Sequence, residues 1–84
     1  MRKIQKIFER KEVLPYLISR GLLQQYSEAK KYLLEGNTLS VRFKERSPKG
    51  SGIWYFRINK QFRAVGVFNA RGDLIIFKID NHQS

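Results

Sequence analysis

Two arginines, Arg57 and Arg63, interrupt the otherwise apolar stretch GIWYFRINKQFRAVGVF. Asp80 and the single histidine of the chain, His82, follow further along the sequence. A guanidinium group is planar and permanently charged, so it can form paired hydrogen bonds with phosphate oxygens. An imidazole exchanges protons near neutral pH. These residue types predict chemistry on a phosphodiester if the fold brings them to one surface.

The residues around the two arginines alternate as two antiparallel strands joined by a three-residue turn, Asn59 to Gln61. Directly opposed residues project from the same face of a sheet, so this register places Arg57 opposite Arg63 on one face. A two-residue turn would instead place Arg57 on the face of Phe62 and bury an unpaired charge. The three-residue turn gives a core face of Trp54, Phe56, Ile58, Phe62, Ala64 and Phe68, and an outer face of Tyr55, Arg57, Arg63, Val65 and Val67.

A third strand is predicted over DLIIFKIDN, residues 73–81. A turn at 71–72 and a turn at 70–73 give the same pairing. In that pairing Asp80 faces Arg63 and Lys78 faces Val65, while Phe68 faces Ile75, Gly66 faces Phe77 and Ala64 faces Ile79. The predicted site therefore gathers Tyr55, Arg57, Arg63, Lys78, Asp80 and His82, with Arg42, Lys44 and Arg46 beside them and Lys49 in the neighbouring loop.

Each of these residues also has a purely structural interpretation. Arg63 and Asp80 could form an ordinary cross-strand ion pair. His82 could be a solvated surface residue, and Tyr55 could simply cover apolar surface. The basic residues at 42, 44 and 46 could protect an exposed sheet edge from aggregation. The convergence of so many cationic groups on one face favours the functional interpretation.

The rest of the chain predicts the elements that must position this face. A short strand is expected within residues 3–8, followed by a helix from Glu12 with Leu14, Leu17 and Ile18 at helical spacing. Gly21 marks a break, a second helical stripe runs over residues 22–33, and the EGN segment at 35–37 ends it. LSVRFKER, residues 39–46, alternates like a strand, with Leu39, Val41 and Phe43 on one side. The order predicts a two-layer α+β domain over residues 1–84, with a short strand and a helical hairpin packed on a four-stranded antiparallel sheet.

The composition limits the partners and the chemistry. The 84 residues include 17 Lys and Arg against 7 Asp and Glu, a net charge of +10. Such a charge favours polyanions: nucleic acid, an anionic membrane surface or an acidic protein. The absence of cysteine excludes disulfides and thiolate metal sites, and no paired ligand histidines, P-loop, GxGxxG or GxSxG motif occurs. No apolar run has membrane-spanning length or the form of a signal peptide, so a soluble cytoplasmic protein without a metal is expected.

With these residues the sequence resembles the RelE/ParE-like toxins of bacterial type II toxin–antitoxin systems, in particular the RelE, YoeB and HigB branch. GIWYFRINKQFRAV is similar to the family's glycine, arginine-bearing strand, short turn and R-x-V/I strand. GDLIIFKIDNHQ is similar to its terminal strand with a polar, His- or Tyr-containing end. The resemblance implies a RelE-like fold and cleavage of mRNA in the ribosomal A site, without a metal or other cofactor.

The resemblance also implies roles for individual residues. Arg57 and Arg63 match arginines that bind the phosphate and stabilise the transition state. His82 matches a general acid/base, and Lys44 resembles a basic residue on the strand before the loop. Asp80 resembles an acidic residue that orients neighbouring groups.

The implied partners are RNA, the ribosome and a cognate acidic antitoxin that covers the basic face. No membrane partner is expected, and the chain is expected to be a monomer alone and a hetero-oligomer with its antitoxin. The sequence departs from the family at Gln83, where several members have a tyrosine, and no glutamate clearly matches the candidate base of YoeB. Two other functions therefore remain open: a non-catalytic antitoxin-binding module that keeps the fold, and a ParE-like inhibitor of DNA gyrase.

Overall fold

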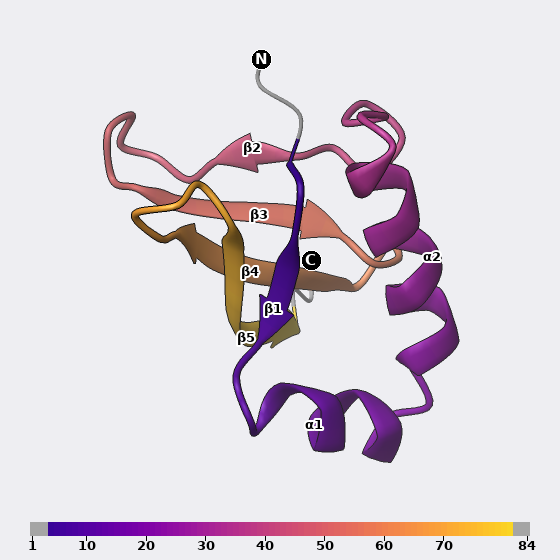
Figure 1. Cartoon of the computed structure of the whole chain (residues 1–84). Helices are drawn as coiled ribbons and strands as arrows, with labels where there is room; N and C mark the ends of the chain where they lie inside the picture. Colours follow the sequence, from indigo (N-terminus) through magenta and orange to yellow (C-terminus); the bar gives the residue numbers. More distant parts are fainter. Residues whose placement is uncertain (1–3, 82–84) are drawn as a thin grey trace.

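A computed structural model of the chain describes residues 4–81 (Figure 1). Its sheet has the strand order β1-β5-β4-β3-β2, in which β1 runs parallel to β5 and the other pairs are antiparallel. The predicted α+β class is confirmed, but the sheet has five strands instead of four because the N-terminal strand joins its edge. The elements are β1 (Ile7–Glu9), α1 (Val13–Ser19), α2 (Leu23–Leu34), β2 (Lys44–Glu45), β3 (Ile53–Arg57), β4 (Phe62–Phe68) and β5 (Leu74–Asn81).

Strand β1 is shorter and later than the predicted segment 3–8. Backbone hydrogen bonds fix it against β5: Leu74 N–H donates to Lys6 O at 3.1 Å, and Arg10 N–H donates to Ile76 O at 2.9 Å. Ile7 and Ile4 are buried. The short strand is therefore held by the sheet edge and by two apolar side chains, a signal too brief for alternation alone to locate.

Both helices end in the same way, at the glycines that the sequence indicated. Gly21 and Gly36 have φ values of 68° and 85°, which suit glycine. The backbone N–H group after each glycine donates a hydrogen bond to the carbonyl oxygen five residues earlier. Leu22 donates to Leu17 O at 2.8 Å, and Asn37 donates to Tyr32 O at 2.9 Å. This is the Schellman motif. It turns the chain sharply after each helix: in Figure 1, α1 lies below the strands and α2 runs up their right-hand side.

The predicted stripe is correct for α2 and only partly correct for α1. In α2, the stripe residues Tyr26, Ala29 and Leu33 are buried. In α1, Val13 and Leu17 are buried, whereas Leu14 and Ile18 are 42% and 62% exposed. A seven-residue helix buries one narrow row; Leu17 lies on it as predicted, but Val13 takes the place expected for Leu14. The core is completed by Ile58, which directly follows β3, and by five residues of the sheet: Phe56, Phe62, Ala64, Leu74 and Ile76.

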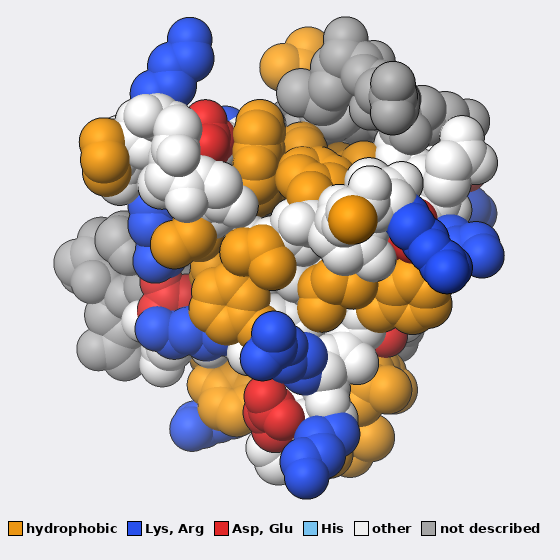
Figure 2. Space-filling model, turned by 60° about the vertical axis from the view of Figure 1, so that its left-hand side comes forward, with side chains coloured by type: hydrophobic (Ala, Val, Ile, Leu, Met, Phe, Trp, Pro, Cys, Tyr) orange, Lys and Arg blue, Asp and Glu red, His pale blue; other side chains and the backbone are white. Residues whose placement is uncertain are grey.

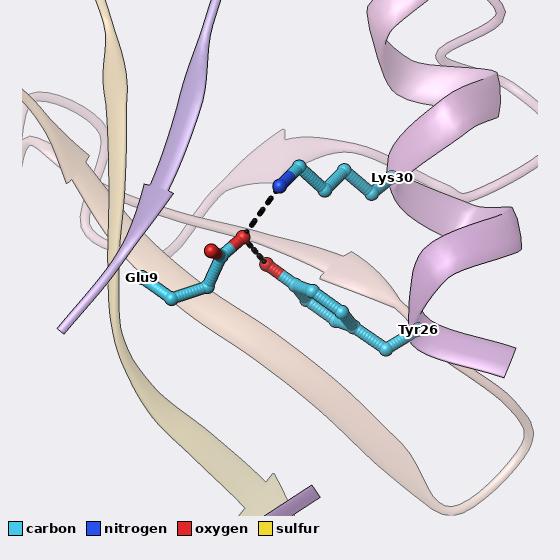
Figure 3. A network of polar contacts seen from close by, with 3 residues as sticks. All are labelled: Glu9, Tyr26 and Lys30. Atoms are coloured by element: carbon cyan, nitrogen blue, oxygen red, sulfur yellow. Dashed lines mark hydrogen bonds and ion pairs between the residues drawn. The ribbon is translucent and has the colours of Figure 1, made fainter. Parts of the chain in front are cut away.

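A polar network ties α2 to β1 (Figure 3). The Tyr26 hydroxyl donates to Glu9 Oε2 at 2.6 Å, and Lys30 Nζ lies 2.8 Å from the same oxygen. Burial, reinforced by the hydrogen bond to Glu9 and by the charge of its carboxylate, raises the pKa of Tyr26 far above its ordinary value. The phenol therefore stays protonated and fixes the position of α2 against the sheet edge.

The prediction of a strand over residues 39–46 is wrong except at Lys44 and Glu45. Leu39 is 90% exposed, and Arg42 adopts φ 51° in a turn where Phe43 N–H donates to Thr38 O at 3.0 Å. Val41 and Phe43 are buried as expected. The alternation therefore reflects a turn that inserts two apolar side chains beside the sheet, because the chain must reverse after α2 to reach β3.

The β3–β4 register is the predicted one. Arg57 pairs with Arg63 and Phe56 with Ala64. Asn59 holds the turn, since its Oδ1 accepts hydrogen bonds from the N–H groups of Gln61 and Phe62, both at 2.8 Å. This side-chain turn fixes the loop length and hence the face on which both arginines lie.

The β4–β5 register is correct near the site and wrong near the turn. Arg63 pairs with Asp80, and Val65 with Lys78, as predicted. Beyond a bulge between Val65 and Gly66 the pairing shifts by one residue, so the predicted pairs of Gly66 with Phe77 and Phe68 with Ile75 do not form. Instead Gly66 pairs with Ile76 and Phe68 with Leu74. The connection is a five-residue loop, 69–73, and the bulge offsets its odd length.

Hydrophobic side chains also reach the surface. Figure 2 shows them gathered across one view of the molecule, with Lys and Arg side chains around them. The exposed large ones are Phe8, Leu14, Ile18, Leu23, Tyr32, Leu39 and Phe68. No helix in residues 4–81 is long and apolar enough to cross a membrane.

Candidate nucleic-acid interface

Five side chains line a small cavity on the sheet face opposite the main core. It measures about 60 Å³, and we call it the cationic cavity; its lining residues are Arg42, Lys44, Tyr55, Arg57 and Arg63. The strand pairing builds it, because Lys44 pairs with Tyr55 on β3 and Arg57 pairs with Arg63 on β4. The two arginines that the sequence singled out therefore meet as expected, together with three of the residues predicted beside them.

Tyr55 lies at the centre of this cluster. The Arg63 Cζ atom is 5.1 Å from the centroid of its ring, and Lys44 Nζ is 6.0 Å from the same centroid. Both distances fit cation–π attraction. Tyr55 thus does more than cover apolar surface, since its ring holds two cations that would otherwise repel each other.

Arg42 reaches the cationic cavity from a turn and not from a strand. Its backbone has φ 51°, a conformation that non-glycine residues rarely adopt. The neighbouring Val41 O accepts a hydrogen bond from Arg57 N–H at 2.7 Å, which joins the turn to β3. The left-handed residue therefore directs a fourth cation toward Arg57 and Arg63.

Asp80 pairs with a different partner from the one considered in the sequence. Although Asp80 lies opposite Arg63 in register, its Oδ2 is 3.3 Å from Arg46 Nη2. The two side chains are 41% and 30% exposed, so this ion pair contributes little stability. Arg63 is thereby left without a carboxylate partner among residues 4–81, and Arg46 does not line the cationic cavity.

The other predicted site residues lie elsewhere or outside the described part. Lys78 is exposed beside Val65 on β5 and does not line the cationic cavity. Lys49 lies in the loop before β3, where hydrogen bonds from the backbone N–H groups of Gly52 and Gly50 lower the pKa of the Glu45 carboxyl. His82 and Gln83 lie outside residues 4–81.

A second hollow, which sequence reasoning missed, adjoins the first. We call it the α2 groove; it measures about 240 Å³ and is lined by Gln25, Glu28, Ala29, Tyr32, Ser40, Val41, Arg57 and Ile58. Arg57 lines both hollows. The polar side of α2 gave a weak signal at residues 25, 28 and 32, which recur at helical spacing, but only the observed turn at residues 38–42 brings a second wall against them.

The cationic cavity is suited to bind an anion. Its lining has four cations and no carboxylate, and guanidinium groups match the geometry of phosphate oxygens. The arrangement can hold a phosphate and stabilise added negative charge upon it. Tyr55 adds a phenol hydroxyl to this cationic lining.

Comparison with known proteins places this geometry on a known fold. No protein-family model and no curated protein sequence matches the chain. Among solved structures, the chain is similar to the one described as the YoeB dimer from Staphylococcus aureus, with a TM-score of 0.67 and 16% sequence identity. The match covers 98% of this chain and 100% of that one. The chain therefore has the same fold as that YoeB protein along nearly its whole length.

Proposed function

We propose that this chain is the toxin of a type II toxin–antitoxin pair and cuts mRNA on the ribosome. The observation that carries the proposal is the cationic cavity, in which Arg57 and Arg63 lie opposite each other with Lys44 and Arg42 beside them. The similarity of fold to the S. aureus YoeB dimer supports the same class of protein. The net charge of +10 suits an RNA-rich partner.

RNA supplies its own nucleophile, so the protein has a limited task. The 2′-hydroxyl oxygen attacks the adjacent phosphorus while the bond from phosphorus to the 5′-oxygen breaks. One group removes the proton of the 2′-hydroxyl, and one group gives a proton to the 5′-oxygen. The products are a 2′,3′-cyclic phosphate and a 5′-hydroxyl. No step in this scheme needs a metal.

The residues are assigned to these steps by their chemistry. Arg57 and Arg63 hold the phosphate and stabilise the charge that builds on it, with Lys44 as a further cation. His82 is assigned the proton transfer, because an imidazole exchanges protons near neutral pH. Asp80 holds Arg46 at 3.3 Å and so adjusts the charge beside the site without touching the RNA.

The partner that restrains the toxin is an acidic antitoxin. A segment rich in Asp and Glu complements the cationic cavity and would compete with RNA for the same arginines. The toxin alone is a cytoplasmic monomer in this proposal, and it forms a hetero-oligomer with the antitoxin.

A binding-only role is the second candidate. It is favoured by the lining of the cationic cavity, which within residues 4–81 contains no carboxylate and no imidazole to move a proton. In that case the chain would bind RNA or antitoxin through the same arginines but would cleave nothing.

Expression in bacterial cells tests the proposal. Wild type should stop growth and incorporation of labelled methionine within minutes, and Arg63→Ala should not, because it removes a phosphate ligand. Arg71→Ala is the matched control, since Arg71 lies in the β4–β5 loop outside the cationic cavity, and it should behave as wild type. Equal arrest by wild type and Arg63→Ala would refute the role of Arg63, and no arrest by wild type would favour the binding-only role.

A further inference from the structure

Two residues of opposite charge line the α2 groove without an ion-pair partner among the described residues. Glu28 on α2 and Arg57 on β3 both line it, and neither forms an ion pair with any residue of the described range 4–81. A carboxylate only accepts hydrogen bonds and a guanidinium only donates them. A base that contacts Glu28 must therefore offer N–H donors to its carboxylate, while Arg57 remains available for a phosphate in the cationic cavity.

The other lining groups add a stacking surface and a further donor. Tyr32 is 47% exposed, and its ring has no aromatic or cation–π partner among the residues described. Gln25 Oε1 accepts a hydrogen bond from Asn59 Nδ2 at 2.8 Å, which fixes the amide and leaves its NH₂ group to donate. Ser40 offers a hydroxyl from the opposite wall.

We propose that the α2 groove is a binding site for one unpaired nucleobase of the RNA, read mainly by Glu28. This inference rests on the proposed function, because Arg57 is the residue that joins the two hollows. With a phosphate in the cationic cavity on one side of Arg57, the base of an adjoining nucleotide enters the α2 groove on the other side. Single-stranded bases are recognised in this way, by stacking on aromatic rings and by hydrogen bonds to their edges.

The two acceptor oxygens of the Glu28 carboxylate favour guanine over uracil. Guanine presents N1–H and its exocyclic amino group side by side, so both can donate to one carboxylate. Its O6 atom then lies near a donor such as the amide of Gln25. Uracil presents a single N–H between two carbonyl oxygens, which the carboxylate repels. The groove volume of about 240 Å³ lies just below the range of roughly 300–1,000 Å³ typical of sites for drug-sized ligands, which suits a single base.

Binding of two short RNAs to the purified full-length chain tests the proposal. The probes are fluorescein-labelled hexamers with the sequences UGUGUG and UUUUUU, methylated at every 2′-hydroxyl so that they cannot be cut. Fluorescence anisotropy at one fixed salt concentration gives both dissociation constants. We expect wild type to bind UGUGUG about tenfold more tightly, as one good paired contact to a base would provide.

Matched substitutions on α2 test whether Glu28 causes the preference for UGUGUG over UUUUUU. Glu28→Gln replaces one acceptor oxygen by a donor and should reduce the preference to less than twofold, with binding of UUUUUU unchanged or slightly tighter. Glu35→Gln removes the same charge from the end of α2, outside the groove, and should keep the tenfold preference. Tyr32→Leu should weaken binding of UGUGUG, because the guanine in the groove loses its stacking partner.

Two results would overturn the proposal: equal binding of the two probes by wild type, or an unchanged preference in Glu28→Gln. Its failure can be told apart from failure of the proposed function. If Arg57→Ala and Arg63→Ala weaken both probes while wild type shows no preference, the cationic cavity binds RNA and the α2 groove is only a solvated helix face. If neither arginine substitution affects binding, the proposed function itself fails.

Discussion

Replacement of Gly66 by alanine should destabilise the protein more than any substitution at a turn glycine. Gly66 lies at the bulge of β4, and a Cβ atom added there would lie 2.5 Å from Ile75 O, 3.1 Å from Ile75 C and 3.0 Å from Ile76 Cδ1. The two Ile75 atoms belong to the backbone of β5, so they can move only if the strand moves. Overpacking of this kind typically costs about 1–3 kcal/mol, and the backbone contacts place Gly66→Ala near 3 kcal/mol.

Gly72→Ala provides the control for this prediction. Gly72 has φ 83° in the β4–β5 loop, but no atom lies within 4 Å of a Cβ placed there. Its cost is therefore the strain of the left-handed conformation alone, about 1 kcal/mol. The difference of about 2 kcal/mol corresponds to a melting temperature lower by about 8–16 °C for a domain of this size.

Urea unfolding followed by far-UV circular dichroism measures both variants. We expect the midpoint of Gly66→Ala to fall well below that of Gly72→Ala, with similar slopes, because the surface exposed on unfolding is unchanged. A Gly66→Ala midpoint equal to or above that of Gly72→Ala would refute the close approach of β5 at the bulge.

Three further predictions concern the polar groups. Tyr26→Phe should remove a pH dependence of the free energy of unfolding. Because the pKa of Tyr26 is raised in the fold, wild-type stability should be intact below the unfolded pKa of about 10 and fall above it by about 1.4 kcal/mol per pH unit. Urea unfolding from pH 8 to pH 11 should therefore show a steeper decline for wild type than for the variant. Asp80→Asn should change the free energy of unfolding by less than about 1 kcal/mol, because its ion pair with Arg46 is partly exposed. It should also tighten RNA binding about twofold at low salt, since it frees Arg46 and raises the net charge. Weaker RNA binding would contradict the peripheral role of Asp80. Tyr55→Ala should weaken RNA binding by up to about fivefold through loss of the cation–π contacts to Arg63 and Lys44, whereas Tyr55→Phe, which keeps the ring, should not.

Local signals explain what the sequence predicted correctly. The β3–β4 register follows from one turn, in which Asn59 accepts two backbone hydrogen bonds and so sets the loop length. The ends of both helices follow from Gly21 and Gly36, whose positive φ values suit glycine. In each case the residue that determines the structure lies within a few positions of its effect. Arg57 and Arg63 could therefore be placed on one face from the sequence alone.

The errors arise where distant segments decide the outcome. The alternation over residues 39–46 suited a strand equally well, and only packing of Val41 and Phe43 against the sheet makes most of it a turn. The β4–β5 loop has an odd number of residues, which the sequence does not reveal. The bulge at Gly66 shifts the pairing by one residue, and this shift returns Asp80 to its predicted place opposite Arg63. The predicted pairing near the site was therefore correct although both proposed turns were not.

The sequence did not predict the ion pair of Asp80 with Arg46 or the α2 groove, because both depend on segments that are distant in the sequence. Arg46 is 34 positions from Asp80 and directly follows β2, which β3 and β4 separate from β5 in the sheet. The α2 groove needs α2 and the turn at residues 38–42 to face each other, which helical periodicity does not specify. The cationic cavity could be largely predicted because it lies on adjacent paired strands, whereas the groove joins two layers.

The most direct test of the account is a map of RNA 5′-hydroxyl ends in cells after brief expression of the chain. We expect wild type and Arg71→Ala to create new ends within translated regions, His82→Ala to create few, and Arg63→Ala to create none. New ends at wild-type levels in Arg63→Ala, or no new ends with wild type, would contradict the claim that the cationic cavity holds the phosphate of an RNA that this protein cuts.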